Sequence, residues 1–105
     1  MTYKEFEEYY KSLGVEIDDT LKEEFIARKM LSDIKLSPII NIEVRGKVNG
    51  EIYRFRKAAF IRELSIKDIV GIFTFAKTEL SKQYHGPCEL LLDEMIELIE
   101  KNKNW

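Results

Sequence analysis

Four cationic side chains flank the dipeptide Asn49-Gly50, and they belong to Arg45, Lys47, Arg54 and Arg56. Arginine binds carboxylates and phosphates through a planar fork of N–H donors, so a cluster of this kind is suited to holding an anion. Side chains of a strand alternate between its two faces, and all four cations share one face if the two segments pair around Asn49-Gly50. This cluster is the best candidate for a binding site in the sequence.

Two kinds of ligand fit such a cluster, namely an acidic surface of a partner protein and the phosphate backbone of a nucleic acid. The alternative without function is that the cations only solvate a sheet or pair with acidic segments of their own chain. The isoelectric point of about 5.5 is low for a dedicated nucleic-acid binder, which often exceeds about 9. A protein partner is therefore the first hypothesis, and nucleic acid is the second.

His85 and Cys88, the only histidine and the only cysteine of the chain, form an H-x-x-C pair. A cysteine near the start of a helix has its thiolate favoured by the helix dipole. A structural zinc site needs more ligands than these two, however, and a Cys-His nucleophile needs a third group that orients the histidine. We therefore expect an ordinary packing or capping role for both, with no metal site and no cofactor.

Carboxylates recur at helical spacing near the C-terminal end, at Glu89, Asp93, Glu97 and Glu100. Such a stripe could supply an acid and a base or imitate a phosphate backbone, but carboxylates at this spacing usually line a solvated helix face. No nucleophile, base and orienting group converge anywhere in the sequence. The expectation is a protein that is not an enzyme and has no catalytic residue.

The composition bounds the class of protein. A chain of 105 residues fits a single domain, 1–105, and 45% hydrophobic with 34% charged residues is typical of a folded globule. The longest stretch without a charge, residues 69–76, is too short to span a membrane. The first eight residues are acidic and amphipathic, unlike a secretory signal. With one cysteine, these features predict a cytoplasmic protein without membrane contact.

The net charge of −2 conceals a strong segregation along the chain. Residues 1–28 carry four basic and eight acidic side chains, and residues 68–105 carry four and seven. Residues 35–67 carry eight basic and three acidic side chains. The chain is acidic at both ends and basic in the middle, where the predicted hairpin lies.

Two helices are predicted before the hairpin. Thr2 can cap the first, and Gly14 is placed to stop it. The cluster 18–20 can cap the second, which should end near residues 34–36, ahead of Pro38. The two helices should form a helical hairpin.

The hairpin should span residues 39–64, because Asn-Gly favours a two-residue turn with positive φ at both positions. Opposite residues then have numbers that sum to 99, so Val44 faces Phe55 and Arg45 faces Arg54. The pairing of Ile42 with Lys57 breaks the apolar pattern, which suggests a bulge or a change of environment beyond Phe55.

Two more helices are predicted after the hairpin. Ser65 and Asp68 have the spacing of a capping box, and apolar residues continue at helical spacing toward Leu80. The competing interpretation is a third strand over residues 70–76, which are rich in residues of high β propensity. The last helix should start at Gly86-Pro87, with proline in its first turn.

The predicted fold is α+β, with the order helix, helix, β-hairpin, helix, helix and all helices packed on one face of a small antiparallel sheet. Tyr9, Tyr53 and Phe75 exceed what the core needs, and Tyr53 joins the four cations as a candidate binding residue. The expected function is that of a small binding or regulatory protein, an accessory or inhibitory factor, which engages an acidic partner through the hairpin. A homodimer built on the exposed edge of the hairpin is a further expectation.

Overall fold

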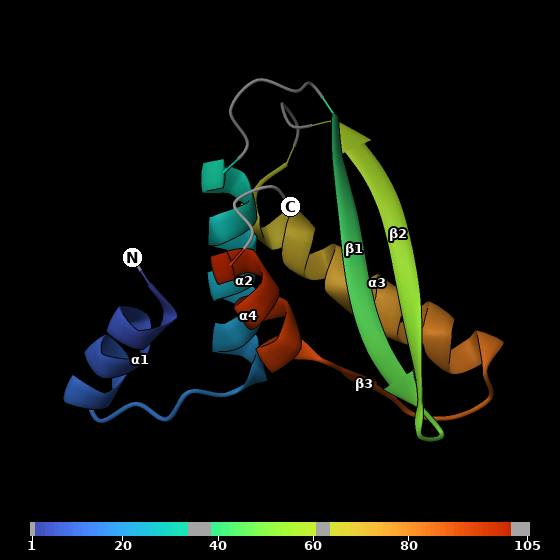
Figure 1. The fold of residues 1–105 in the computed structure, drawn as a ribbon, viewed down its shortest axis with the longest axis horizontal. Helices are drawn as coiled ribbons and strands as arrows, with labels where there is room; N and C mark the ends of the chain where they lie inside the picture. Colours follow the sequence, from blue (N-terminus) through green and yellow to red (C-terminus); the bar gives the residue numbers. More distant parts are fainter. Residues whose placement is uncertain (1, 34–38, 61–63, 102–105) are drawn as a thin grey trace.

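The computed structural model describes residues 2–33, 39–60 and 64–101. Along the chain the elements are α1 (Tyr3–Ser12), α2 (Asp19–Asp33), β1 (Ile39–Val48), β2 (Glu51–Phe60), α3 (Ile66–Gln83), β3 (Cys88–Leu90) and α4 (Leu92–Lys101) (Figure 1). The end predicted for the second helix, residues 34–36, lies outside the described residues.

The sheet has three antiparallel strands in the order β2-β1-β3. α3 crosses behind the two long strands, α2 and α4 lie beside it, and α1 lies at the far side of the molecule from β2 (Figure 1). The helices thus pack on one face of the sheet, and none of the described helices covers the other. The predicted α+β class and the packing of helices on one face are confirmed.

The hairpin forms around Asn49 and Gly50, whose φ angles of 52° and 83° are both positive, as a two-residue turn requires. Pairing continues without interruption from Val48 opposite Glu51 to Ile39 opposite Phe60. The predicted register is therefore right. The bulge suggested beyond Phe55 is wrong for the residues up to Phe60, because Lys57 remains opposite Ile42 and simply projects its amine over a neighbouring ring.

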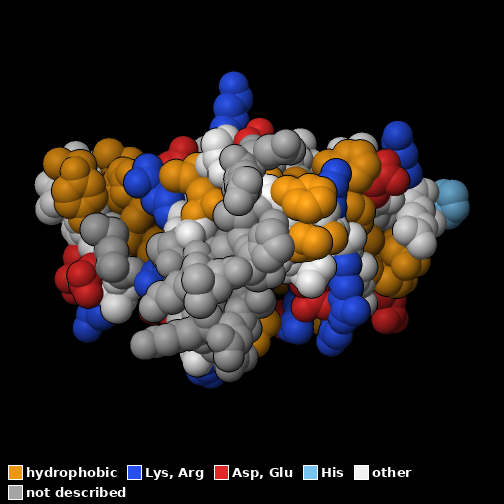
Figure 2. Space-filling view, turned by 90° about the horizontal axis from the view of Figure 1, so that it is seen from above, with side chains coloured by type: hydrophobic (Ala, Val, Ile, Leu, Met, Phe, Trp, Pro, Cys, Tyr) orange, Lys and Arg blue, Asp and Glu red, His pale blue; other side chains and the backbone are white. Residues whose placement is uncertain are grey.

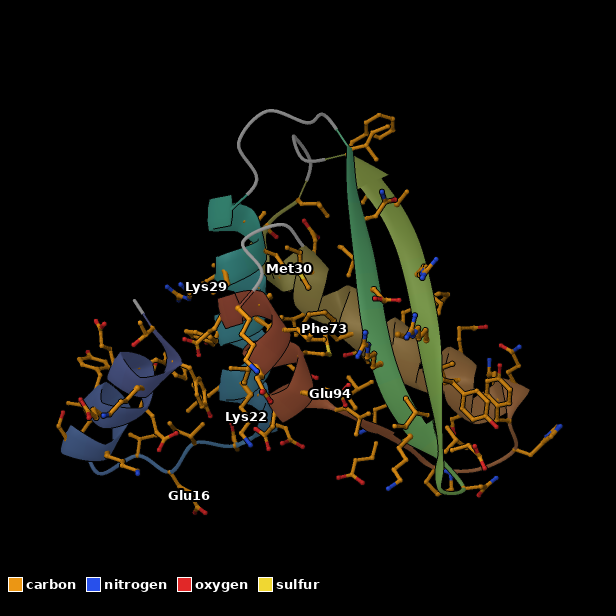
Figure 3. The ribbon with its side chains drawn as sticks, in the orientation of Figure 1. Glu16, Lys22, Lys29, Met30, Phe73 and Glu94 are labelled. Atoms are coloured by element: carbon orange, nitrogen blue, oxygen red, sulfur yellow. The ribbon has the colours of Figure 1, made fainter. Side chains whose placement is uncertain are left out.

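The core fills the space between the sheet and the helices. Ile42 and Val44 of β1 are fully buried there, together with Phe73 of α3 and Met95 of α4. Met30 of α2 and Phe73 point into this interior in the side-chain view (Figure 3). Burying large apolar side chains from all three elements provides the main driving force that holds the helices on the sheet.

Helix starts follow their capping residues. The Thr2 hydroxyl accepts from the Glu5 N–H at 3.2 Å, and an Asp18 carboxylate oxygen accepts from the Leu21 N–H at 3.0 Å. Ser65 and Asp68 form a complete capping box at the start of α3. Residues 70–76 lie inside this helix, so the helical interpretation is confirmed and the competing strand is wrong.

The start predicted for the last helix at Gly86-Pro87 is wrong, and a strand was missed there. Residues 88–90 pair with residues 46–48 of β1 as β3, and α4 begins only at Leu92. Pairing is feasible because Gly46 has no side chain. A Cβ atom at this position would lie 2.6 Å from the Cys88 sulfur, so a larger residue would not fit unless its neighbours moved.

Aromatic rings attach α1 to the rest of the molecule. The ring of Phe6 lies 5.1 Å from that of Phe25 on α2, and the ring of Tyr3 lies 5.2 Å from Phe25. These ring contacts hold α1 against α2, and the predicted helical hairpin of the two helices stays a prediction. Among the helices of the described residues, none has the length and apolar character needed to cross a bilayer.

Candidate binding surface on the β-hairpin

The face of the sheet that no described helix covers is called the outer face below. It consists of Ile39, Asn41, Glu43, Arg45 and Lys47 from β1, Ile52, Arg54, Arg56, Ala58 and Phe60 from β2, and Glu89 from β3. Strand alternation places all four predicted cations on it, and Arg45 lies directly opposite Arg54. The structure thus brings the four cations together, although their surroundings differ.

Arg45 is tied to its own chain. Its Nη1 donates to Oε1 of Glu94 on α4 at 2.7 Å, and its side chain is only 21% exposed. Glu94 lies on the side of α4 that faces the sheet (Figure 3). A short, partly buried, charge-assisted hydrogen bond of this kind is among the stronger polar contacts in a protein, so Arg45 is first a structural residue.

Arg54 and Arg56 share a single acid. The Nε of Arg56 donates to Oε1 of Glu43 at 3.2 Å, whereas Nη1 of Arg54 lies 3.8 Å from the same oxygen. The two side chains are 57% and 72% exposed. Each guanidinium has five N–H donors, and the one acid that they share among the described residues leaves one positive charge without a matching carboxylate there.

Lys47 is exposed near the turn and makes no ion pair with a carboxylate of the described residues. Glu89 of β3 is its register partner on the neighbouring strand. Lys47 therefore lies beside an acid, Glu89, and does not extend a continuous basic stripe.

Tyr53 does not belong to this surface. It lies on the opposite face of β2, opposite Gly46, and its ring stacks on that of Tyr84 with centroids 3.4 Å apart and planes 10° apart. The reason is the alternation of side chains, which separates Tyr53 from Arg54. Tyr9 and Phe75, the other two aromatic residues expected in excess of the core, are exposed at 53% and 49%.

Phe75 of α3 lies next to β2, and the sequence alone could not predict this position. Its ring is 5.7 Å from the ring of Phe55, and the amine of Lys57 lies 5.4 Å from its centroid. An exposed aromatic side chain on α3 thus flanks the strand that carries Arg54 and Arg56. The sequence offered its high content of aromatic residues as the only signal.

His85 and Cys88 lie in different environments. Cys88 is buried in β3 rather than placed at a helix start, and burial raises the pKa of its thiol. His85 is exposed in a turn with φ of 57°. An open cavity of about 500 Å³ lies beside Cys88, lined by Lys77, Thr78, Ser81, Lys82 and Pro87, but the Ser81 hydroxyl already donates to the Gly86 carbonyl at 2.6 Å.

The predicted acidic stripe is divided between two elements. Glu89 lies on β3, whereas Asp93, Glu97 and Glu100 lie on α4, and Glu97 pairs with Lys101 at 2.7 Å. In the part of the chain that the structure describes, no three histidine, cysteine or acidic side chains are grouped so that they could hold a metal ion. No protein-family model, curated protein or solved structure matches this chain.

Proposed function

We propose that this protein is a binding or regulatory module, without enzymatic activity, that engages an acidic surface of a partner protein through β2 of the hairpin. One observation carries the proposal. Arg54 and Arg56 project from a face that no described helix covers and share one carboxylate, that of Glu43. A second carboxylate would stabilise these two guanidinium groups, because it can accept two parallel N–H hydrogen bonds from one of them.

Charge distribution favours a protein over a nucleic acid. A phosphate backbone binds through many cations at once, and its affinity comes mainly from the counterions that these cations release. Glu43 and Glu89 interrupt the outer face, and basic and acidic side chains are interspersed in the view from above (Figure 2). A few discrete carboxylates fit this arrangement better than a continuous row of phosphates.

The test is a pair of matched double variants. Arg54→Gln/Arg56→Gln removes both exposed arginines of β2, and Lys4→Gln/Arg28→Gln removes the same charge from α1 and α2, on the side of the molecule away from β2 (Figure 1). Glutamine avoids new repulsion against Glu43, and thermal unfolding verifies that both variants fold. We expect the tagged wild type and the control to capture an acidic protein from cell extract that the β2 variant loses.

The captured protein is then purified and titrated against all three forms. A loss of at least about tenfold in affinity for the β2 variant alone supports the proposal. Equal affinity of the β2 variant and the control contradicts it. Capture of nucleic acid instead, with a log-log salt slope of several units that falls by about one for each arginine removed, assigns the surface to phosphate binding.

A further inference from the structure

β2 is an edge strand with an unusually regular edge. It is the first strand in the order β2-β1-β3, runs over ten residues, contains no proline, and pairs with β1 without a bulge. No strand of the described residues pairs with its other side. A long, regular edge is a template for the addition of another strand, and proteins usually shorten, bulge or cover such edges.

One hydrogen bond fixes which backbone groups of β2 face that edge. The Arg45 carbonyl accepts from the Leu91 N–H at 3.0 Å, so the backbone of Arg45 points toward β3 and away from β2. Arg54, directly opposite, therefore points its own N–H and carbonyl away from β1. Alternation extends this orientation to Ile52, Arg56 and Ala58, whose backbone groups line the open edge.

The residues with outward backbone groups also carry the exposed cations. In an antiparallel pair, side chains of directly opposite residues lie on the same face within contact distance. A strand added beside β2 would thus place its own side chains opposite Arg54 and Arg56 on the outer face. The side chain between them would fall on the other face, opposite Phe55, where the half-exposed Phe75 of α3 lies.

We propose that β2 accepts an extended segment of the partner protein as a fourth strand, with the pattern acidic, apolar, acidic. This inference rests on the proposed function and specifies how the acidic partner binds. The two acidic residues meet Arg54 and Arg56, and the apolar residue between them packs against Phe55 and Phe75. Backbone hydrogen bonds supply affinity, and the alternating pockets supply specificity.

A second copy of this chain fits the edge less well. A two-fold pairing of β2 with itself that is centred on Phe55 puts Arg54 of one copy opposite Arg56 of the other. A pairing centred on Arg56 puts two identical arginines opposite one another. Like charges directly opposite destabilise a pair of strands, so the charges favour an acidic segment over a dimer through this edge.

The probe is a synthetic peptide in which glutamate and valine alternate over the length of β2, compared with a peptide of equal composition that has the glutamates in one block and the valines in another. Affinity for the full chain is measured by calorimetry, and amide hydrogen exchange is measured by NMR. We expect the alternating peptide to bind at least about tenfold more tightly. We also expect the exchange of the Arg54 and Arg56 amides, rapid in the protein alone, to slow markedly in the complex.

Two further measurements locate the contact. Exchanging the valines of the alternating peptide for serines should weaken binding several-fold, and Phe75→Ala should abolish that difference. Ala58→Pro, which removes one outward N–H and leaves both arginines, should also weaken binding, because proline is tolerated on an edge but cannot donate to an added strand.

The outcomes separate this inference from the proposed function. If both peptides bind equally and the Arg54 and Arg56 amides stay unprotected, strand addition is wrong, whereas an acidic partner that depends on the two arginines still stands. If the alternating peptide does not bind, strand addition is also wrong. Protection of these amides without peptide, together with a concentration-dependent increase in sedimenting mass, would assign the edge to a homodimer instead.

Discussion

Arg45 on β1 and Glu94 on α4 are 49 residues apart in the sequence and 2.7 Å apart in the structure. The carbonyl of the same Arg45 also accepts a hydrogen bond from the Leu91 N–H at 3.0 Å. Two contacts from one residue thus fix the start of α4 against β1. The four cations of the hairpin are therefore unequal, since one holds the fold and Arg54 and Arg56 remain exposed.

The contact between Arg45 and Glu94 should be measurable as stability. Arg45→Gln should lower the free energy of unfolding by about 1 kcal/mol, since the bond is charge-assisted but only partly shielded from solvent. The matched control is Arg56→Gln, which removes a far more exposed arginine and should change the value by less than about 0.5 kcal/mol. Urea titration measures the free energy of unfolding of both variants. An equal decrease in the two would contradict the structural role of Arg45.

The close approach at Gly46 makes a second prediction. A Cβ atom there would lie 2.6 Å from the Cys88 sulfur and 2.9 Å from Cδ1 of Leu80, so these two buried side chains or the elements that carry them must shift. Gly46→Ala should therefore destabilise the protein by about 1 to 3 kcal/mol.

The control for Gly46→Ala is Gly71→Ala, because Gly71 lies exposed inside α3 with nothing within 4 Å of its added Cβ. This substitution should stabilise the protein by up to about 1 kcal/mol through helix propensity. The midpoints of thermal unfolding of the two variants are compared, with circular dichroism as the signal. Stabilisation by Gly46→Ala would show that β3 does not approach β1 as closely as described.

Local signals account for what the sequence predicts correctly. Asn49 and Gly50 determine the turn between themselves, and the register of the hairpin follows from the turn. Ser65 and Asp68 are three residues apart, and their mutual hydrogen bonds need no other part of the chain. Features of this kind are settled within a few residues, so they can be deduced without knowledge of the fold.

Long-range contacts account for what the sequence misses. Residues 88–90 follow a proline in a position typical of a helix start, but their pairing with β1 depends on an empty site at Gly46, more than forty residues earlier. The partner of Arg45 likewise depends on where α4 comes to lie. Neither contact leaves a local pattern, so the clustering of the four cations is predictable and the distribution of carboxylates among them is not.

The thiol of Cys88 should react slowly with thiol reagents in the folded protein. Burial raises its pKa above the ordinary 9.0, and the thiol is not placed at a helix start where a dipole could lower it. At neutral pH the thiolate fraction is therefore smaller than in a model peptide, and access is restricted as well. A chromogenic disulfide should label the folded protein far more slowly than the protein in denaturant, and equal rates would contradict the burial of the sulfur.

The same pKa shift has a consequence for stability in alkali. The thiol ionises more readily in the unfolded chain than in the folded protein, so its contribution is complete below pH 9.0 and is lost as pH rises through the raised folded pKa. Cys88→Ala should remove this dependence. Urea midpoints measured between neutral and alkaline pH should converge for wild type and variant at the alkaline end, and a constant difference would contradict the shift.

The capping box of α3 predicts the opposite dependence in acid. The Ser65 N–H and then its hydroxyl donate to Oδ2 of Asp68, both at 2.9 Å, and lower the pKa of that carboxyl. The stabilisation is complete above the ordinary value of 3.8 and is lost as pH falls through the lowered folded pKa. Asp68→Asn should therefore be less stable than wild type at neutral pH, and the difference should shrink in strong acid. A difference independent of pH would contradict the role of the carboxylate.

Glu43 pairs with both Arg54 and Arg56, so it competes with an acidic peptide for the same two guanidinium groups. Glu43→Gln should release both guanidinium groups and raise the affinity for the alternating acidic peptide by about two- to fivefold, as expected for an exposed ion pair worth up to about 1 kcal/mol. Glu51→Gln makes the same change in net charge from an exposed site on β2 where no ion pair is formed with the described residues, so it should alter affinity much less. Because the two variants differ only in which acid is removed, an equal gain from both would mean that net charge, rather than competition for the two arginines, governs binding.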